Sequence, residues 1–179
     1  MPNGGNAFRD DRADQLAGID NVTDLFLDCE WADVLASQLV SIGLVSADLR
    51  HTFYAERDPL PADPMPFVRV AVYPLLERGE AAMSDALLTL RLRTFLATVP
   101  KPSIGYDSPH DRSLCQFVLD GMDEPEPEGP DPPDIQWQHL DLDADRERWW
   151  RDHPEHQLQR HHAGVDALAL RGAWLGQRS

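Results

Sequence analysis

Two segments whose apolar residues alternate with other residues, 67–73 and 87–95, constrain the fold of this chain most. Three valines occupy every second position of the first segment, and three leucines do so in the second: Val68, Val70, Val72, Leu88, Leu90 and Leu92. A period of two predicts β-strands that bury one face, with arginines on the other. A polar connector separates the segments, so we expect them to pair as a long β-hairpin.

Further segments extend this pattern to the order helix, strand, strand, helix, strand, strand. We predict helices over 23–42 and 109–120, strands over 135–143 and 165–175, and a short helix over 145–152. The second helix has the clearest boundaries, because Ser108 and Asp111 match a capping box and Gly121 follows its end. The sequence predicts an α+β fold: a mainly antiparallel sheet of about four strands in two hairpin-like pairs, packed against two or three helices.

The 179 residues fit a single domain. We expect a flexible N-terminal arm over residues 1–20 and one α/β domain over residues 21–179. Residues 123–134 are acidic and rich in proline, which predicts a solvated loop. Cys29 and Cys115 lack the spacing of metal ligands, and two buried free thiols are expected.

The charge of the chain restricts its partners. Acidic residues number 31 against 16 basic ones, the formal net charge is −15, and Lys101 is the only lysine. Such a surface repels phosphates, so sequence-specific binding of nucleic acid is not expected. The acid excess favours a halophilic host, although a GC-rich genome also explains the scarcity of lysine. The N-terminus does not resemble a signal peptide and no apolar run matches a membrane span, so we expect a soluble, intracellular protein without a membrane partner.

Few residues suggest chemistry. Four histidines between His153 and His162 could bind a transition metal, but their spacing matches no zinc-protease motif, and a polar helix end explains them equally well. The aspartates from Asp141 to Asp152 resemble the opening of a calcium loop, except that Arg146 replaces the required glycine. No nucleophile elbow or phosphate-binding loop occurs. We therefore predict no catalytic residue, no cofactor and no metal, and a protein that is not an enzyme.

Assembly is the remaining expectation. Adjacent helical residues point about 100° apart, so Trp149 and Trp150 cannot both face one core. The connector between the two predicted strands is the second candidate contact region. The predicted subunit or partner interface consists of Leu75, Leu76, Glu77, Arg78, Trp149 and Trp150.

The order of elements resembles the tail-terminator (tail-completion) proteins of long-tailed viruses. The segments that carry the resemblance are 23–42, 66–74, 87–95, 108–121 and 165–176. The resemblance implies a structural virion protein of the tail and neck region, assembled in the host cytoplasm as a homo-oligomeric ring. Its partners would be the tail tube protein and a head-closure or connector protein. The alternatives are a head–tail connector or neck protein, a metal-binding enzyme or regulator centred on the histidines, and a host interaction protein.

Overall fold

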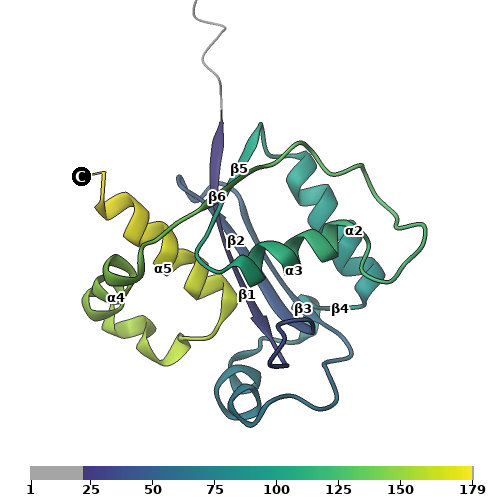
Figure 1. Ribbon diagram of the computed structural model, residues 1–179, viewed down its shortest axis with the longest axis horizontal. Coiled ribbons are helices and arrows are strands. Elements are labelled where there is room, and N and C mark those ends of the chain that lie inside the picture. Colours follow the sequence, from purple (N-terminus) through teal and green to yellow (C-terminus); the bar gives the residue numbers. More distant parts are fainter. Residues whose placement is uncertain (1–21, 179) are drawn as a thin grey trace, which may run out of the picture.

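A six-stranded mixed sheet organises the part of the chain that the computed structural model describes, residues 22–178 (Figure 1). The strand order is β4-β3-β2-β1-β5-β6. The strands are β1 (Thr23–Trp31), β2 (Leu39–Ser46), β3 (Thr52–Arg57), β4 (Ala82–Met83), β5 (Pro102–Tyr106) and β6 (Gln136–His139). The first three form an antiparallel meander, whereas β5 and β6 continue the sheet in parallel beside β1, and β4 pairs in parallel with β3.

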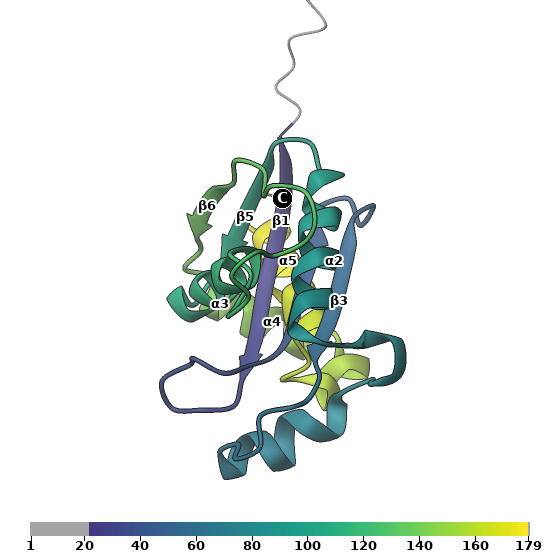
Figure 2. The same cartoon turned by 90° about the vertical axis from the view of Figure 1, so that its right-hand side faces the viewer.

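Helices cover both faces of this sheet (Figures 1 and 2). One face carries α2 (Asp85–Ala97) and α3 (Pro109–Leu119). The other face carries α5 (Ala163–Gly176), with α4 (Asp143–Asp152) packed against it. Because β1 is central, alternate residues enter different cores: Leu25 and Leu27 face α2 and α3, and Phe26 faces α5.

The start of α5 lies directly on the sheet. A Cβ atom added to Gly43 of β2 would lie 2.5 Å from the carbonyl oxygen of Ala163 and 2.6 Å from the nitrogen of Gly164. Only a residue without a side chain permits this approach. The glycine therefore fixes the first turn of α5 against β2.

The α+β class is confirmed, but the predicted sheet is only partly right, because the sheet is mixed and has six strands. The segment 23–42 is not a helix: it contains β1 and the beginning of β2. Its apolar residues are numerous because both faces of these central strands are buried. The apolar residues of this segment therefore belong to two strands and not to one face of a helix.

The predicted hairpin is also wrong. The segment 67–73 contains the helical turn η1 (Val68–Val72), and 87–95 lies inside α2. Val68 and Val72 are buried while Val70 is 74% exposed, so the valines follow a helical i, i+4 spacing. Leu88 and Leu92 are buried with Leu96 by the same spacing.

The C-terminal half is partly as predicted. The capping box of α3 and the helix over 145–152 are confirmed, and the strand over 135–143 is reduced to β6. The predicted strand over 165–175 is instead the helix α5, which buries Val165, Ala169, Leu170 and Ala173. Residues 123–134 contain no helix or strand, and both cysteines are free and buried. The predicted N-terminal arm lies outside the described residues.

Candidate active site

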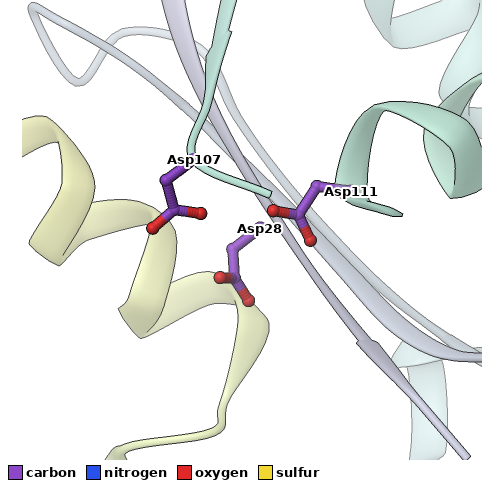
Figure 3. Close-up of side chains that lie close together, drawn as sticks. All are labelled: Asp28, Asp107 and Asp111. Carbon is purple, nitrogen blue, oxygen red and sulfur yellow. The ribbon is translucent and has the colours of Figure 1, made fainter. Parts of the chain in front are cut away.

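Carboxylates from four elements meet where β1 and β5 end, on the side of the sheet that α5 covers. Figure 3 shows Asp28 on β1, Asp107 directly after β5, and Asp111 in the first turn of α3. Carboxylate oxygens of these three residues lie within 4.8 Å of one another. A second group within the same limit joins Asp28 to Glu30 and Asp166. Asp28 belongs to both groups and is therefore the centre of the cluster.

Strand geometry explains this convergence. Asp28 and Glu30 are two residues apart on β1 and therefore point to the same face. β5 runs parallel to β1, with Phe26 opposite Gly105, and the same register carried two residues further places Asp107 beside Asp28. Carboxyl ends of neighbouring parallel strands form the usual ligand-binding edge of an α/β sheet.

The first turn of α5 and the residues before it complete the site. Asp166 lies in this turn, and its Oδ2 accepts a hydrogen bond of 2.7 Å from the backbone N–H of His161. The imidazole Nδ1 of His161 lies 3.7 Å from Glu30 Oε1, and the side chain is 46% exposed. The ring of Phe67 meets the imidazole edge-on, with centroids 4.9 Å apart. His161 therefore stands at the mouth of the carboxylate cluster.

A cavity of about 310 Å³ contains the carboxylates and opens to solvent. Its lining includes all five acidic residues, Arg146 from α4, and the aromatic residues Trp31 and Phe67. The volume is at the lower end of the range for small-molecule sites. The cavity thus combines a concentrated negative charge with flat apolar surfaces.

Burial and mutual repulsion raise the pKa values of two of these carboxylates. Burial raises the pKa of Asp28 well above its usual range, and the Asp166, Asp111, Glu30 and Asp107 carboxylates raise it further. Burial, and then the charge of Glu30, raises the pKa of Asp166 to about 7. Like charges packed together out of water favour protonation unless a cation compensates them.

One carboxylate oxygen of the cluster has no hydrogen-bond partner among the described residues. Oδ2 of Asp28 is buried and accepts no hydrogen bond from any residue between 22 and 178. Buried polar atoms are nearly always paired, so this oxygen is available to a ligand bound in the acidic cavity. A divalent cation would satisfy this oxygen and offset the crowded charge together.

The other oxygens differ in how free they are. Asp111 accepts backbone N–H groups on both oxygens, from Cys29 at 3.1 Å and from Ser108 at 3.2 Å. Asp107 forms an ion pair with Arg146. Asp28, Glu30 and Asp166 are therefore the principal candidate ligands, with the remaining lone pairs of Asp111 beside them. An all-oxygen ligand set suits hard cations such as Mg²⁺ and Mn²⁺.

The histidine stretch does not form its own metal site. His153 and His156 stack on the ring of Trp149, at centroid distances of 4.2 and 5.6 Å. His162 stacks on Tyr54 at 4.4 Å. Within residues 22–178 these imidazoles do not form a metal-binding group, and only His161 of the stretch lines the carboxylate cavity.

The predicted interface residues lie elsewhere. Leu75 ends the helical turn η2 (Tyr73–Leu75), and the next three residues lead into η3 (Gly79–Ala81). Arg78 pairs with the fully buried carboxylate of Glu56. Trp150 is 2% exposed within the chain, so of the tryptophan pair only Trp149 offers surface. An interface at these residues stays a prediction.

The sequence predicted no site role for the acidic residues of the cavity, which are Asp28, Glu30, Asp107, Asp111 and Asp166. Of the cavity's titratable side chains, only His161 belonged to a predicted candidate site, the histidine stretch. Two signals were present: an acid-x-acid pattern at the end of the apolar run 25–29, and an aspartate directly after the short run 102–106. Both patterns indicate a site only when the apolar run before them is taken as a strand. Because a helix was predicted over 23–42, the first pattern did not indicate a strand end.

No family and no relative supplies an identity for this site. No protein-family model matches the chain, and no curated protein matches it significantly. None of the helices between residues 22 and 178 is long and apolar enough to cross a membrane. The function must therefore be inferred from the chemistry of the cavity.

Proposed function

We propose that this chain is a divalent-cation-dependent phosphodiesterase that cleaves short nucleic-acid strands or similar nucleotide esters. The observation that carries this proposal is Asp28, whose carboxylate belongs to two acidic groups and has one buried oxygen that accepts no hydrogen bond from residues 22–178. A carboxylate shared by two such groups could contribute to the binding of two cations. Two cations about 3.5–4 Å apart stabilise both the attacking and the leaving oxygen in the hydrolysis of phosphate esters.

The residues have distinct roles in this proposal. Asp28, Glu30 and Asp166 would hold one cation, and Asp28 with Asp111 would hold the other. Bound cations polarise the phosphate and lower the pKa of a water molecule. His161, at the mouth of the cavity, would accept the proton of the attacking water, because histidine is the commonest general base near neutral pH.

Glu30 connects the cation to the base. Its carboxylate, 3.7 Å from Nδ1, raises the pKa of His161, while burial acts in the opposite direction. A cation bound by Glu30 would weaken the attraction between this carboxylate and the imidazole. The imidazole is then more readily neutral and available to take a proton.

The aromatic rings and the net charge suggest the substrate. Phe67 is 51% exposed and lines the cavity beside the carboxylates, and its ring meets that of His161 at the mouth. Bases stack on such rings without regard to sequence. A long strand needs many basic contacts along its backbone, whereas this chain has a net charge of −15. A short strand or a strand end, held by cations and stacking, fits both features.

The proposal replaces the expectation that the chain is not an enzyme. A role in a tail-terminating ring stays an untested prediction. Its basis is weaker, since segments 23–42, 87–95 and 165–176 adopt secondary structures other than those on which the resemblance depended.

Hydrolysis by the purified chain tests the proposal. The substrates are bis(p-nitrophenyl) phosphate and a fluorescein-labelled single strand of five nucleotides, each with Mn²⁺, with Mg²⁺ or with EDTA. We expect cation-dependent cleavage that Asp28→Asn reduces by roughly 10³-fold, since the cations supply several kcal/mol of transition-state stabilisation. Asp152→Asn, an exposed aspartate of α4 outside the cavity, is the matched control. Absence of cleavage with both cations, or equal cleavage by the Asp28→Asn protein, would refute the proposal.

A further inference from the structure

One side chain with a permanent positive charge, that of Arg146, lines the acidic cavity. Of the described residues that line it, only Arg146 carries a charge that is positive at every physiological pH. It comes from α4, a helix that contributes no other residue to the lining. A positive group among five carboxylates can neutralise one of them or bind an anionic group of the substrate.

The geometry allows Arg146 to do both. One terminal nitrogen, Nη1, donates to Oδ2 of Asp107. The other, Nη2, lies 3.9 Å from Asp143, a carboxylate that is 84% exposed and therefore weakly held. A guanidinium has five N–H donors in a planar fork, so the bond to Asp107 leaves most of them free to bind an anion.

The backbone holds this side chain in place. The N–H of Arg146 donates to the carbonyl oxygen of Leu142 at 2.8 Å, and Leu142 is 5% exposed in the core under α5. Asp107 is fixed from its own side, because its carbonyl oxygen lies 3.1 Å from Nε2 of His139. Arg146 is thus anchored at both its helix and its ion pair, with 27% of the side chain exposed.

We infer that Arg146 is a catalytic residue that donates hydrogen bonds to a non-bridging oxygen of the scissile phosphate, from the side of the cavity next to Asp107. Asp107 is then a positioning residue that orients the guanidinium and does not bind a cation. The inference rests on the proposed phosphodiesterase function. Preorganised arginine donors stabilise the charge that builds on a phosphoryl group in its transition state.

This assignment also divides the acidic residues. Asp107 is neutralised by Arg146, which leaves Asp28, Glu30, Asp111 and Asp166 for two cations. Without Arg146, the carboxylate of Asp107 would be free to bind a cation. Removing the guanidinium should therefore impair turnover while Mn²⁺ binding persists or strengthens.

Kinetics of Arg146→Gln and Arg146→Lys in the full chain test the inference, with the five-nucleotide strand and saturating Mn²⁺. Arg148→Gln is the control: this exposed arginine of α4 pairs with Asp145 outside the cavity. Loss of one preorganised donor typically reduces kcat by about 10²–10³-fold. We expect that loss for Arg146→Gln with a smaller change in KM, a partial loss for Arg146→Lys, and normal kinetics for Arg148→Gln.

Two further readouts separate a catalytic role from a structural one. Calorimetric titration should show that Mn²⁺ binds Arg146→Gln at least as tightly as the wild type. Added guanidinium chloride at millimolar concentration should partly restore turnover to Arg146→Ala, because the free cation can occupy the vacated position. A kcat within twofold of the wild type for Arg146→Gln, or weakened Mn²⁺ binding, refutes the role of Arg146 while phosphodiesterase activity stands. A wild-type chain without cation-dependent cleavage refutes both.

Discussion

Replacing Asp166 by asparagine should make the cation-free protein more stable, and the gain should depend on pH. Burial, and then the neighbouring Glu30 carboxylate, raises the pKa of Asp166 from 3.8 to about 7. A carboxyl group with a raised pKa binds more protons in the folded chain than in the unfolded chain. Its contribution to stability is therefore complete below about pH 4 and is lost as the pH rises through 7.

The shift of about three pKa units gives the size of the effect. Each unit corresponds to about 1.4 kcal/mol, so the ionised Asp166 side chain costs at most about 4 kcal/mol above pH 7. At pH 5 the same relation gives about 2 kcal/mol. Asparagine has the same shape and never ionises, and its oxygen can still accept the N–H of His161. The stability of Asp166→Asn relative to the wild type should thus rise by about 2–3 kcal/mol between pH 5 and pH 8.

Urea unfolding at both pH values, in EDTA, measures this difference, with Asp152→Asn as the control for removal of one exposed charge.

A second experiment repeats the unfolding in the presence of Mn²⁺. A cation at about 100 times its dissociation constant stabilises the protein that binds it by about 2.7 kcal/mol. Mn²⁺ should stabilise the wild type by this amount. The Asp166→Asn protein should lose most of this stabilisation by Mn²⁺. A difference between the two proteins that does not change with pH would refute the reasoning about crowded carboxylates.

Two other substitutions test separate parts of the structure. His161→Gln should reduce kcat by about 10²–10⁴-fold, the usual contribution of a general base, while calorimetry shows that Mn²⁺ still binds. His156→Gln, a histidine that stacks on Trp149 away from the cavity, should keep normal kinetics, and equal rates for the two variants would exclude His161 as the base. Gly43→Ala should destabilise the chain by about 1–3 kcal/mol or more in urea unfolding, because the new methyl group would lie 2.5 Å from the carbonyl oxygen of Ala163. An unchanged unfolding midpoint for Gly43→Ala would show that α5 does not pack as closely on β2 as the structure indicates.

The proposed cation sites reconcile the acidity of the chain with an anionic substrate. Five carboxylates line one site, and a net charge of −15 raises the concentration of cations around the protein. Bound cations reverse the local charge where the phosphate must sit. The acidity that argued against nucleic-acid binding along the surface therefore favours cation binding in the cavity.

Local signals predicted some elements well. The capping box at Ser108 and Asp111 depends on residues three positions apart, and α3 begins where it was predicted. The same Asp111 also lies in the candidate site, where its carboxylate accepts the N–H of Cys29, 82 positions away. No local pattern could predict that second contact.

Periodicity failed where two periods fit the same residues. Val68 and Val72 satisfy both an alternating and a helical pattern, and only the exposure of Val70 distinguishes them. In β1 and β2 the failure was the opposite, since strands buried on both faces lose their alternation. With these elements predicted wrongly, nothing in the sequence placed Asp28 and Glu30 of β1 near Asp166 in the first turn of α5.

The sequence by itself determined four features of this protein. They are its charge, its α+β class, the boundaries of α3 and the absence of regular structure in 123–134. Only the tertiary structure decided which acids meet. Asp28, Asp107 and Asp166 are scattered over 139 positions of the chain, and the parallel pairing of β5 with β1, together with the close approach of α5 to Gly43, brings them to one cavity. Long-range strand pairing and helix packing have no signature within a short window of sequence, so the site emerges only when the chain is folded.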